Sequence, residues 1–144
     1  MGRNENPGMH EDVSPPTAEE AARVADFRAA LRRFERQTER AARECGLTPR
    51  WYLLLLLVKG SPELNERSTV SELSQRLHLA QSTVTELVGR VQAAGLLRRE
   101  QSTTDGRVAH LSLTDEGERR FAHAFRSLAA ERRALRDIIG RLRD

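Results

Sequence analysis

Residues 69–113 read TVSELSQRLHLAQSTVTELVGRVQAAGLLRREQSTTDGRVAHLSL and carry the strongest structural signals of the chain. The first part of this stretch predicts two short helices in close succession. Thr69 and Glu72 have the spacing of a capping box and open the first helix. The second, over residues 81–94, repeats aliphatic residues every three or four positions and ends at Gly95. Two helices joined by so short a turn are typical of a helix-turn-helix.

The periodicity changes from helical to a period of two after Gly95. Residues 96–100 and 107–113 read as strands, and in the second strand Leu and Ala alternate with His and Ser. The polar residues 101–106 separate them. This pattern predicts a β-hairpin directly after the second short helix.

Two long helices with apolar seams flank this unit. The first begins at a capping box of Thr17 and Glu20 and runs to about Glu44, and the last covers residues 115–140. Both seams have the alternating spacing of a heptad repeat. The first seam contains Val24, Phe27, Leu31, Phe34, Thr38, Ala41 and Cys45, and the second contains Phe121, Phe125, Leu128, Arg132, Leu135, Ile139 and Leu142. Such a seam can pack against the core of its own chain, but a second subunit is the simplest partner that would cover it.

A helix over residues 49–59 precedes the helix-turn-helix. Thr48 and Pro49 have the order of an N-cap and a first helical residue, and Gly60 ends the helix. Because the chain from Trp51 to Val58 is apolar on every side, we expect this helix to be buried all round as the central core element.

The order of these elements predicts a mainly α fold with a small β component. It is that of a winged helix-turn-helix with a two-stranded β wing and long N- and C-terminal dimerisation helices. The second short helix of such a unit lies in the major groove of DNA, with its first residues at base edges. The candidates for contact with DNA are Gln81, Ser82, Thr83, Thr85 and Arg90. A solvated surface explains a polar helix face equally well, but the adjacent hairpin favours DNA binding.

Composition supports a nucleic-acid partner and excludes several other classes of function. Residues 1–20 carry a net charge of −4 and residues 21–144 carry +7, and all cationic side chains except Lys59 are arginines. The four histidines are scattered and Cys45 is alone, so we expect no catalytic residues, no metal site and no cofactor. No apolar run is long enough for a membrane span. The N-terminus lacks a secretory signal, so we expect a cytoplasmic protein.

The segment from about Glu19 to Arg120 resembles the MarR family of transcriptional regulators. The resemblance rests on several motifs together, namely Leu47-Thr48, Val70-x-x-Leu73-x-x-x-Leu77, Ser82-Thr83-Val84-Thr85-x-Leu87-Val88, Ala94-Gly95-Leu96-Leu97-x-Arg99, Asp105-x-Arg107 and Leu113-Thr114-x-x-Gly117. It implies a homodimer that binds double-stranded DNA at a pseudo-palindromic operator, usually as a repressor. In this family a small phenolic or other aromatic effector often releases the operator.

The resemblance also implies roles for single residues. Arg107 matches a wing-tip arginine that enters the minor groove, and Asp105 matches the acid that braces the wing. One of the neighbouring arginines Arg98 and Arg99 is expected to meet phosphate, and we select Arg99. Trp51 and Tyr52 are the large aromatic residues beside the first helix and are candidates for an effector pocket, although core packing explains them equally well.

The expected division of the chain is a disordered tail over residues 1–17 and a MarR-like domain over 18–144. Within that domain, residues 18–45 and 115–144 would dimerise and residues 48–114 would form the winged helix-turn-helix. The resemblance implies two terminal helices, but only 30 residues follow Thr114, so we expect a curtailed module. It would be a single long helix or one broken near Ala130.

Two alternative functions remain open at this stage. The first is a redox-sensing regulator that responds through Cys45. Its position in the apolar seam instead favours a packing role for this thiol. The second is a winged-helix protein-interaction module without sequence-specific DNA binding, against which the basic body and the small polar helix face argue.

Overall fold

The computed structural model describes residues 13–142. The part of the expected N-terminal tail that precedes residue 13 therefore lies outside the described residues. The elements follow each other in the predicted order. They are α1 (Ala18–Glu44), α2 (Pro49–Lys59), α3 (Val70–Leu77), α4 (Gln81–Ala93), β1 (Leu97–Gln101), β2 (Ala109–Leu113), α5 (Asp115–Ser127) and α6 (Ala129–Gly140).

Threonine side chains set the beginnings of four helices. Thr17, Thr48, Thr69 and Thr114 each accept a hydrogen bond from the main-chain N–H three residues further on, with lengths of 3.0–3.2 Å. Such a bond satisfies one of the N–H groups that a helix leaves without an internal partner. These caps explain why the predicted starts of α1, α2, α3 and α5 are confirmed to the residue.

Most of the core lies in the winged body, which we define as α2, α3, α4, β1 and β2, and it extends to the end of α1 and to α5. Its centre is α2, whose Leu54, Leu55 and Val58 are fully buried against aliphatic side chains of α3, α4 and β2. The expectation that α2 is buried all round is wrong at Leu53, which is 41% exposed. Leu53 lines an open cavity towards α1 instead of packing into the core.

The wing is an antiparallel pair in which Leu97 lies opposite Leu113 and Gln101 opposite Ala109. Ser68, which precedes α3, adds a β-bridge to Leu111, with two main-chain hydrogen bonds of 2.8 and 3.0 Å. This bridge ties the wing to the start of the helix-turn-helix. The second strand begins at Ala109 rather than at Arg107, because Arg107 still belongs to the turn.

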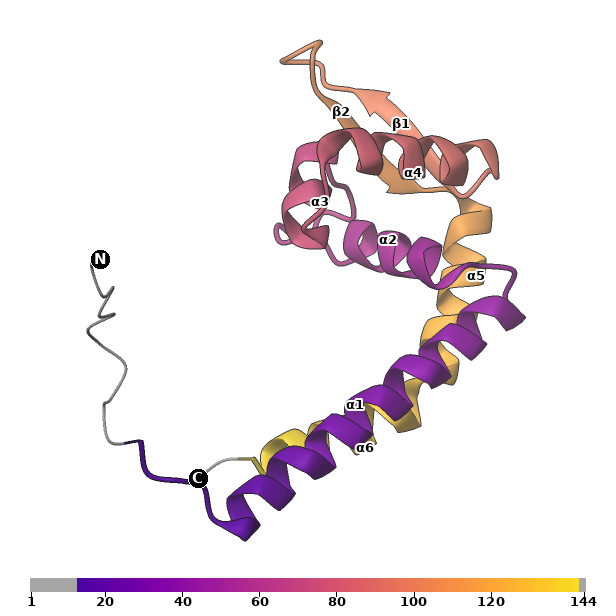
Figure 1. Cartoon of the computed structure of the whole chain (residues 1–144). Coiled ribbons are helices and arrows are strands. Elements are labelled where there is room, and N and C mark those ends of the chain that lie inside the picture. Colours follow the sequence, from indigo (N-terminus) through magenta and orange to yellow (C-terminus); the bar gives the residue numbers. More distant parts are fainter. Residues whose placement is uncertain (1–12, 143–144) are drawn as a thin grey trace, which may run out of the picture.

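Three helices, α1, α5 and α6, form an arm that projects from the winged body (Figure 1). α5 leaves the body, and α6 then runs back along α1 in the opposite direction, so part of the α1 seam is covered within the chain. The prediction of one helix over residues 115–140 is wrong, and the alternative of a broken helix is confirmed with the break at Leu128. The residues after Thr114 therefore form two helices.

A side-chain contact of Arg132 accompanies the break at Leu128. Arg132 donates a hydrogen bond of 2.6 Å to the carbonyl of Phe125, and its guanidinium lies 3.9 Å from the centre of the Phe125 ring. The N–H of Leu128 donates to that same carbonyl over 3.3 Å, in a tighter turn than the α-helix. Arg132, which interrupts the seam in the sequence, thus occupies the carbonyl that a continuous helix would need.

Candidate nucleic-acid interface

The first turns of α4 present a polar surface to solvent. Gln81, Ser82, Thr83 and Thr85 are all exposed. They face outwards because the opposite side of the helix is anchored in the core by Val84, Leu87, Val88 and Val91. The structure therefore brings four of the predicted contact residues together at one helix end, where hydroxyl and amide groups are free of long flexible stems.

The N-terminus of α4 differs from those of α1, α2, α3 and α5. Its N-cap is Ala80, which makes no side-chain capping bond, so the first N–H groups point outwards without a side-chain acceptor. The positive end of the helix dipole lies at the same place. This end of α4 is electrostatically suited to approach a polyanion.

The turn that places α4 relies on polar contacts with α3. Ser74 Oγ donates to the carbonyl of Leu79 over 2.5 Å, and Gln81 Nε2 donates to Ser71 Oγ over 3.2 Å. His78 adopts a left-handed conformation with φ of 54° at the C-cap of α3. Ser71 could not be selected from the sequence, because its bond to Gln81 exists only once the two helices have packed.

Arg90 lies further along the exposed side of α4 and has a partner within the helix. Its Nη2 is 2.6 Å from Glu86 Oε1, one turn earlier. Both side chains are about two-thirds exposed, so this ion pair contributes little to stability. Arg90 can exchange Glu86 for a phosphate at small cost.

The wing turn is held by two polar side chains. Asp105 Oδ1 accepts a hydrogen bond of 3.0 Å from the main-chain N–H of Arg107. Ser102 Oγ accepts from the N–H groups of Thr104 and Asp105 over 3.3 and 3.2 Å. The expectation that Asp105 braces the wing is thus given a mechanism, in which the carboxylate fixes the main chain of the turn and Arg107 projects from it, exposed.

The two wing arginines differ in their surroundings. Arg98 Nη2 lies 3.5 Å from the carbonyl of Leu113, so this guanidinium turns back towards the protein. Arg99 lies on the other face of β1, opposite Leu111, and both arginines are exposed. Contact between Arg99 and phosphate stays a prediction.

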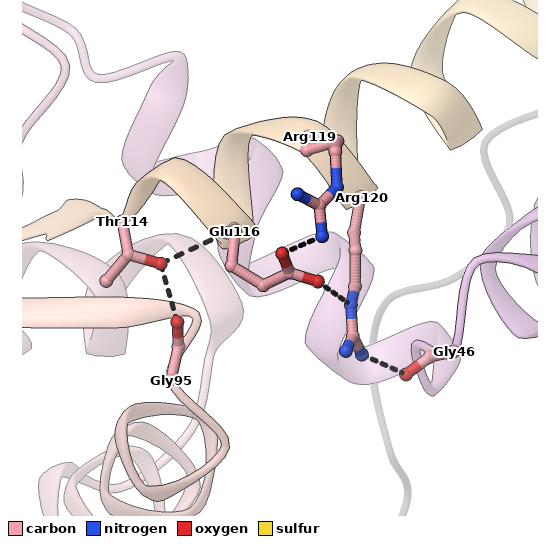
Figure 2. A network of polar contacts seen from close by, with 7 residues as sticks. Gly46, Gly95, Thr114, Glu116, Arg119 and Arg120 are labelled. Carbon is pink, nitrogen blue, oxygen red and sulfur yellow. Dashed lines mark hydrogen bonds and ion pairs between the residues drawn. The ribbon is translucent and has the colours of Figure 1, made fainter.

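A polar network at the base of the wing connects it to the arm (Figure 2). Thr114 Oγ donates a hydrogen bond of 2.6 Å to the carbonyl of Gly95, at the end of α4. Glu116 binds both Arg119 and Arg120, and Arg120 Nη1 lies 3.5 Å from the carbonyl of Gly46, at the end of α1. The bond from Arg120 holds the pKa of the Glu116 carboxyl below its ordinary value. The turns after α1 and α4 are therefore both fixed to the start of α5.

An open cavity of about 460 Å³ lies where α1, α2, α5 and α6 meet. It is lined by Phe34, Glu35, Thr38, Glu39, Pro49, Tyr52, Leu53, Leu56, Phe125 and Arg132. Tyr52 is therefore placed at the cavity, and burial raises the pKa of its hydroxyl. Trp51, the other candidate ligand residue, packs against the core instead. The lining is mostly apolar and carries three charged side chains, those of Arg132, Glu35 and Glu39.

Cys45 is half-buried at the C-cap of α1 and packs against the core of the winged body. Burial raises the pKa of its thiol above the ordinary value, which lowers the fraction of thiolate at neutral pH. These surroundings are those of a packing residue.

Within residues 13–142, no three or more His, Cys, Asp and Glu side chains gather in a way that would hold a metal ion. None of the helices described over that range is long and apolar enough to cross a membrane.

The sequence of this chain is similar to those of several known proteins. Residues 46–108 match a family model described as MarR family. The HTH-type transcriptional regulator YsmB of Bacillus subtilis (strain 168) is 33% identical over 107 residues, which cover 72% of this chain and 70% of YsmB. The HTH-type transcriptional repressor MdtR of the same organism is 37% identical over 76 residues, which cover 53% of this chain but only 46% of MdtR.

A solved structure shows the same fold. The MarR family regulator Sco3205 of Streptomyces coelicolor, whose structure is in complex with DNA, is 25% identical with a TM-score of 0.64. The match covers 87% of this chain and 78% of Sco3205. Together with the winged helix-turn-helix and its arm, these likenesses show that the chain belongs to the MarR family of transcriptional regulators.

Proposed function

We propose that this protein is a homodimeric repressor that binds a pseudo-palindromic operator through α4 and the wing. The observation that carries the proposal is the exposed group of Gln81, Ser82, Thr83 and Thr85 at the uncapped start of α4. Sco3205, a relative with the same fold, is in complex with DNA in its structure. MdtR, a relative over the matched segment, is a repressor.

The DNA contacts divide by chemistry. The four small polar side chains at the start of α4 read base edges in the major groove, where a helix fits. Arg90 and Arg99 meet phosphates, which add affinity and little sequence preference. Arg107 projects from the wing tip into the minor groove, where a narrow A·T segment has an enhanced negative potential.

The arm supports the homodimer, with residues 18–45 and 115–144 as the dimerisation module and 48–114 as the DNA-binding unit. In the described chain no residue of α6 is fully buried, and Val24 and Ile139 are about half exposed on their seams. The antiparallel pair of α1 and α6 buries few side chains of its own, so a second copy is the cover that completes it. Two α4 helices related by the dimer axis would read half-sites about 10 bp apart, one turn of the duplex.

Light scattering tests the dimer. We expect a mass of twice 16.3 kDa at micromolar concentration, and replacing Leu31 and Phe34 by Asp should give monomers. A mass of one chain for the native protein would refute this part of the proposal.

The cavity at the base of the arm supports a second element of the proposal, release of the operator by a small aromatic effector. Phe34, Tyr52 and Phe125 supply aromatic rings to the lining, and Arg132, Glu35 and Glu39 supply charged groups of both signs. An occupant would contact α1 and α6 of the arm as well as α2 of the winged body, so it can change the angle between the two.

Selection of bound genomic fragments followed by sequencing tests the function as a whole. We expect enrichment of a pseudo-palindrome, and salt-sensitive binding without any sequence preference would instead support a protein-interaction module. Titration of the enriched duplex with aromatic compounds then tests the effector. A compound that releases DNA from the native protein should lose its effect on Tyr52→Ala if the cavity is its site.

A further inference from the structure

Five arginines form a continuous row along α1. Arg28, Arg32, Arg36, Arg40 and Arg43 follow one another at intervals of four, four, four and three positions, and all five are exposed. Residues at these intervals are neighbours on a helix surface, and at the rise of an α-helix the row is about 22 Å long. We define these five residues as the arginine stripe. By the periodicity of the α-helix, the stripe lies on the side of α1 opposite the apolar seam.

Few carboxylates neutralise the arginine stripe. Within residues 13–142, its first three members form no ion pair, and Arg40 pairs with Glu44 over 3.4 Å in an exposed contact. The neighbouring carboxylates Glu35 and Glu39 line the cavity beside α2. Like charges three or four positions apart on a helix repel each other. The stripe therefore has an excess of positive charge that an anionic partner would compensate.

The composition of the arginine stripe favours a phosphate polymer over a protein as that partner. A protein interface has a core of buried apolar and aromatic side chains, whereas the large apolar residues of α1 belong to the seam on its other side. A phosphate backbone needs only a row of cations, and guanidinium groups bind phosphate in a bidentate manner. Duplex DNA carries one negative charge per about 1.7 Å of its axis, so a segment as long as the stripe offers enough phosphates for all five arginines.

The arginine stripe lies away from the duplex that α4 would bind. α4 and the wing lie on the side of the winged body that faces away from the arm, and α2 lies between them and the arm (Figure 1). A duplex in contact with α4 and the wing therefore leaves the stripe open to a second segment of DNA.

We propose that the arginine stripe binds the phosphate backbone of a second segment of double-stranded DNA, without sequence preference, while α4 and the wing hold an operator. One protein would then bridge two segments of DNA through surfaces at opposite ends of the winged body and the arm. This surface goes beyond the proposed function, since contacts to phosphates alone carry no direct sequence information.

A capture experiment with the full-length protein tests the bridge. The selected operator duplex is immobilised in excess, so that the protein is held through α4, and a labelled duplex without the operator motif is then added. We expect the native protein to capture the labelled duplex, and this capture should weaken steeply as the salt concentration rises.

The stripe variant combines Arg28→Gln, Arg32→Gln and Arg36→Gln. Its affinity for a short operator duplex should stay within about twofold of the native value, because the stripe does not contact that duplex. For the labelled duplex, the slope of log affinity against log salt should fall by about 2.7, since each lost phosphate contact removes about 0.9. Lysine at the same three positions keeps the charge and should restore most of the capture.

The matched control removes the same charge from α5 and α6. It combines Arg126→Gln, Arg133→Gln and Arg136→Gln, which replace three exposed arginines outside the stripe, and it should capture the labelled duplex as the native protein does. Arginine, lysine and glutamine have similar helix propensities, so the helices should stay folded in every variant. Light scattering checks that each variant keeps the mass of the native protein.

Several results would overturn the inference while the proposed function stands. They are absence of capture by the native protein, native capture by the stripe variant, an equal loss of capture in the stripe variant and the matched control, and capture of phosphatidylglycerol vesicles but not of the duplex. If the native protein enriches no operator, the proposed function fails instead. The stripe is then tested on a duplex without any motif, where the salt slopes of the native protein and the stripe variant should still differ by about 2.7.

Discussion

Replacement of Gly117 by alanine should destabilise the protein, although alanine favours helices. Gly117 is the third residue of α5 and lies against the main chain of Leu96, just before β1. A Cβ there would lie 3.0 Å from the Leu96 carbonyl carbon and closer still to its oxygen, where ordinary contact begins at about 3.4 Å. That oxygen accepts a hydrogen bond of 3.1 Å from the N–H of Thr114, so it cannot turn away freely.

The magnitude follows from three opposing contributions. Overpacking costs about 1–3 kcal/mol, and weakening the Thr114 bond adds up to about 1 kcal/mol. The higher helix propensity of alanine offsets at most about 1 kcal/mol of this destabilisation. The free energy of unfolding should therefore fall by about 2 kcal/mol, which lowers Tm by about 4–8 °C for a chain of this size.

Thermal unfolding followed by circular dichroism at a fixed protein concentration measures this change. The matched control is Gly89→Ala in α4, because no atom lies within 4 Å of the Cβ position there. That variant should gain about 0.5–1 kcal/mol. The same substitution thus has opposite signs at two helical glycines, and a Gly117→Ala protein as stable as the native one would refute the packing argument.

Three further predictions concern single side chains. His78→Gly should raise Tm, since the left-handed conformation at φ 54° costs a non-glycine residue about 1 kcal/mol; an unchanged or lower Tm would show that His78 makes a compensating contact. Lys59 bonds Glu118 and Glu66, each over 2.9 Å, and these bonds raise its pKa. The native protein should therefore be more stable than Lys59→Met below pH 10.5, and this difference should vanish as pH rises through the raised pKa of Lys59. A difference in stability that persists at pH 12 would exclude the ion pairs as its source. Cys45→Ser should leave the DNA affinity and its response to peroxide unchanged, whereas loss of a native peroxide response in this variant would favour the redox-sensing alternative.

Most of the fold could be predicted from the sequence because the signals that specify the helices are local. Threonine caps and aliphatic periodicity depend on residues three or four positions apart, and so the starts of α2 and α5 could be predicted to the residue. The break at Leu128 could not be predicted as a single outcome, because the heptad spacing continues across it. The bond from Arg132 to the carbonyl of Phe125, which accompanies the break, is a detail of side-chain conformation that spacing does not encode.

The candidate DNA-binding site also contains some residues that the sequence predicts and others that it does not. The polar face of α4 follows from helical periodicity, so Ser82, Thr83 and Thr85 could be selected from sequence. Ser71 and Ser102 could not, since each acts through a hydrogen bond across a turn whose geometry is not encoded in spacing. The cavity beside Tyr52 forms between segments far apart in the chain, and no local pattern separates it from ordinary core packing.

In the proposed complex, α4 sets the sequence preference and the wing adds affinity. The most direct test of this division is a titration of the native protein, Thr85→Ala and Arg107→Ala on the selected operator and on duplexes with altered half-sites, each at several salt concentrations. We expect Arg107→Ala to weaken binding to all duplexes by a similar factor and to lower the slope of log affinity against log salt by about 1. Thr85→Ala should change which half-site is preferred. Native affinity of Arg107→Ala, together with a native sequence preference of Thr85→Ala, would contradict the account.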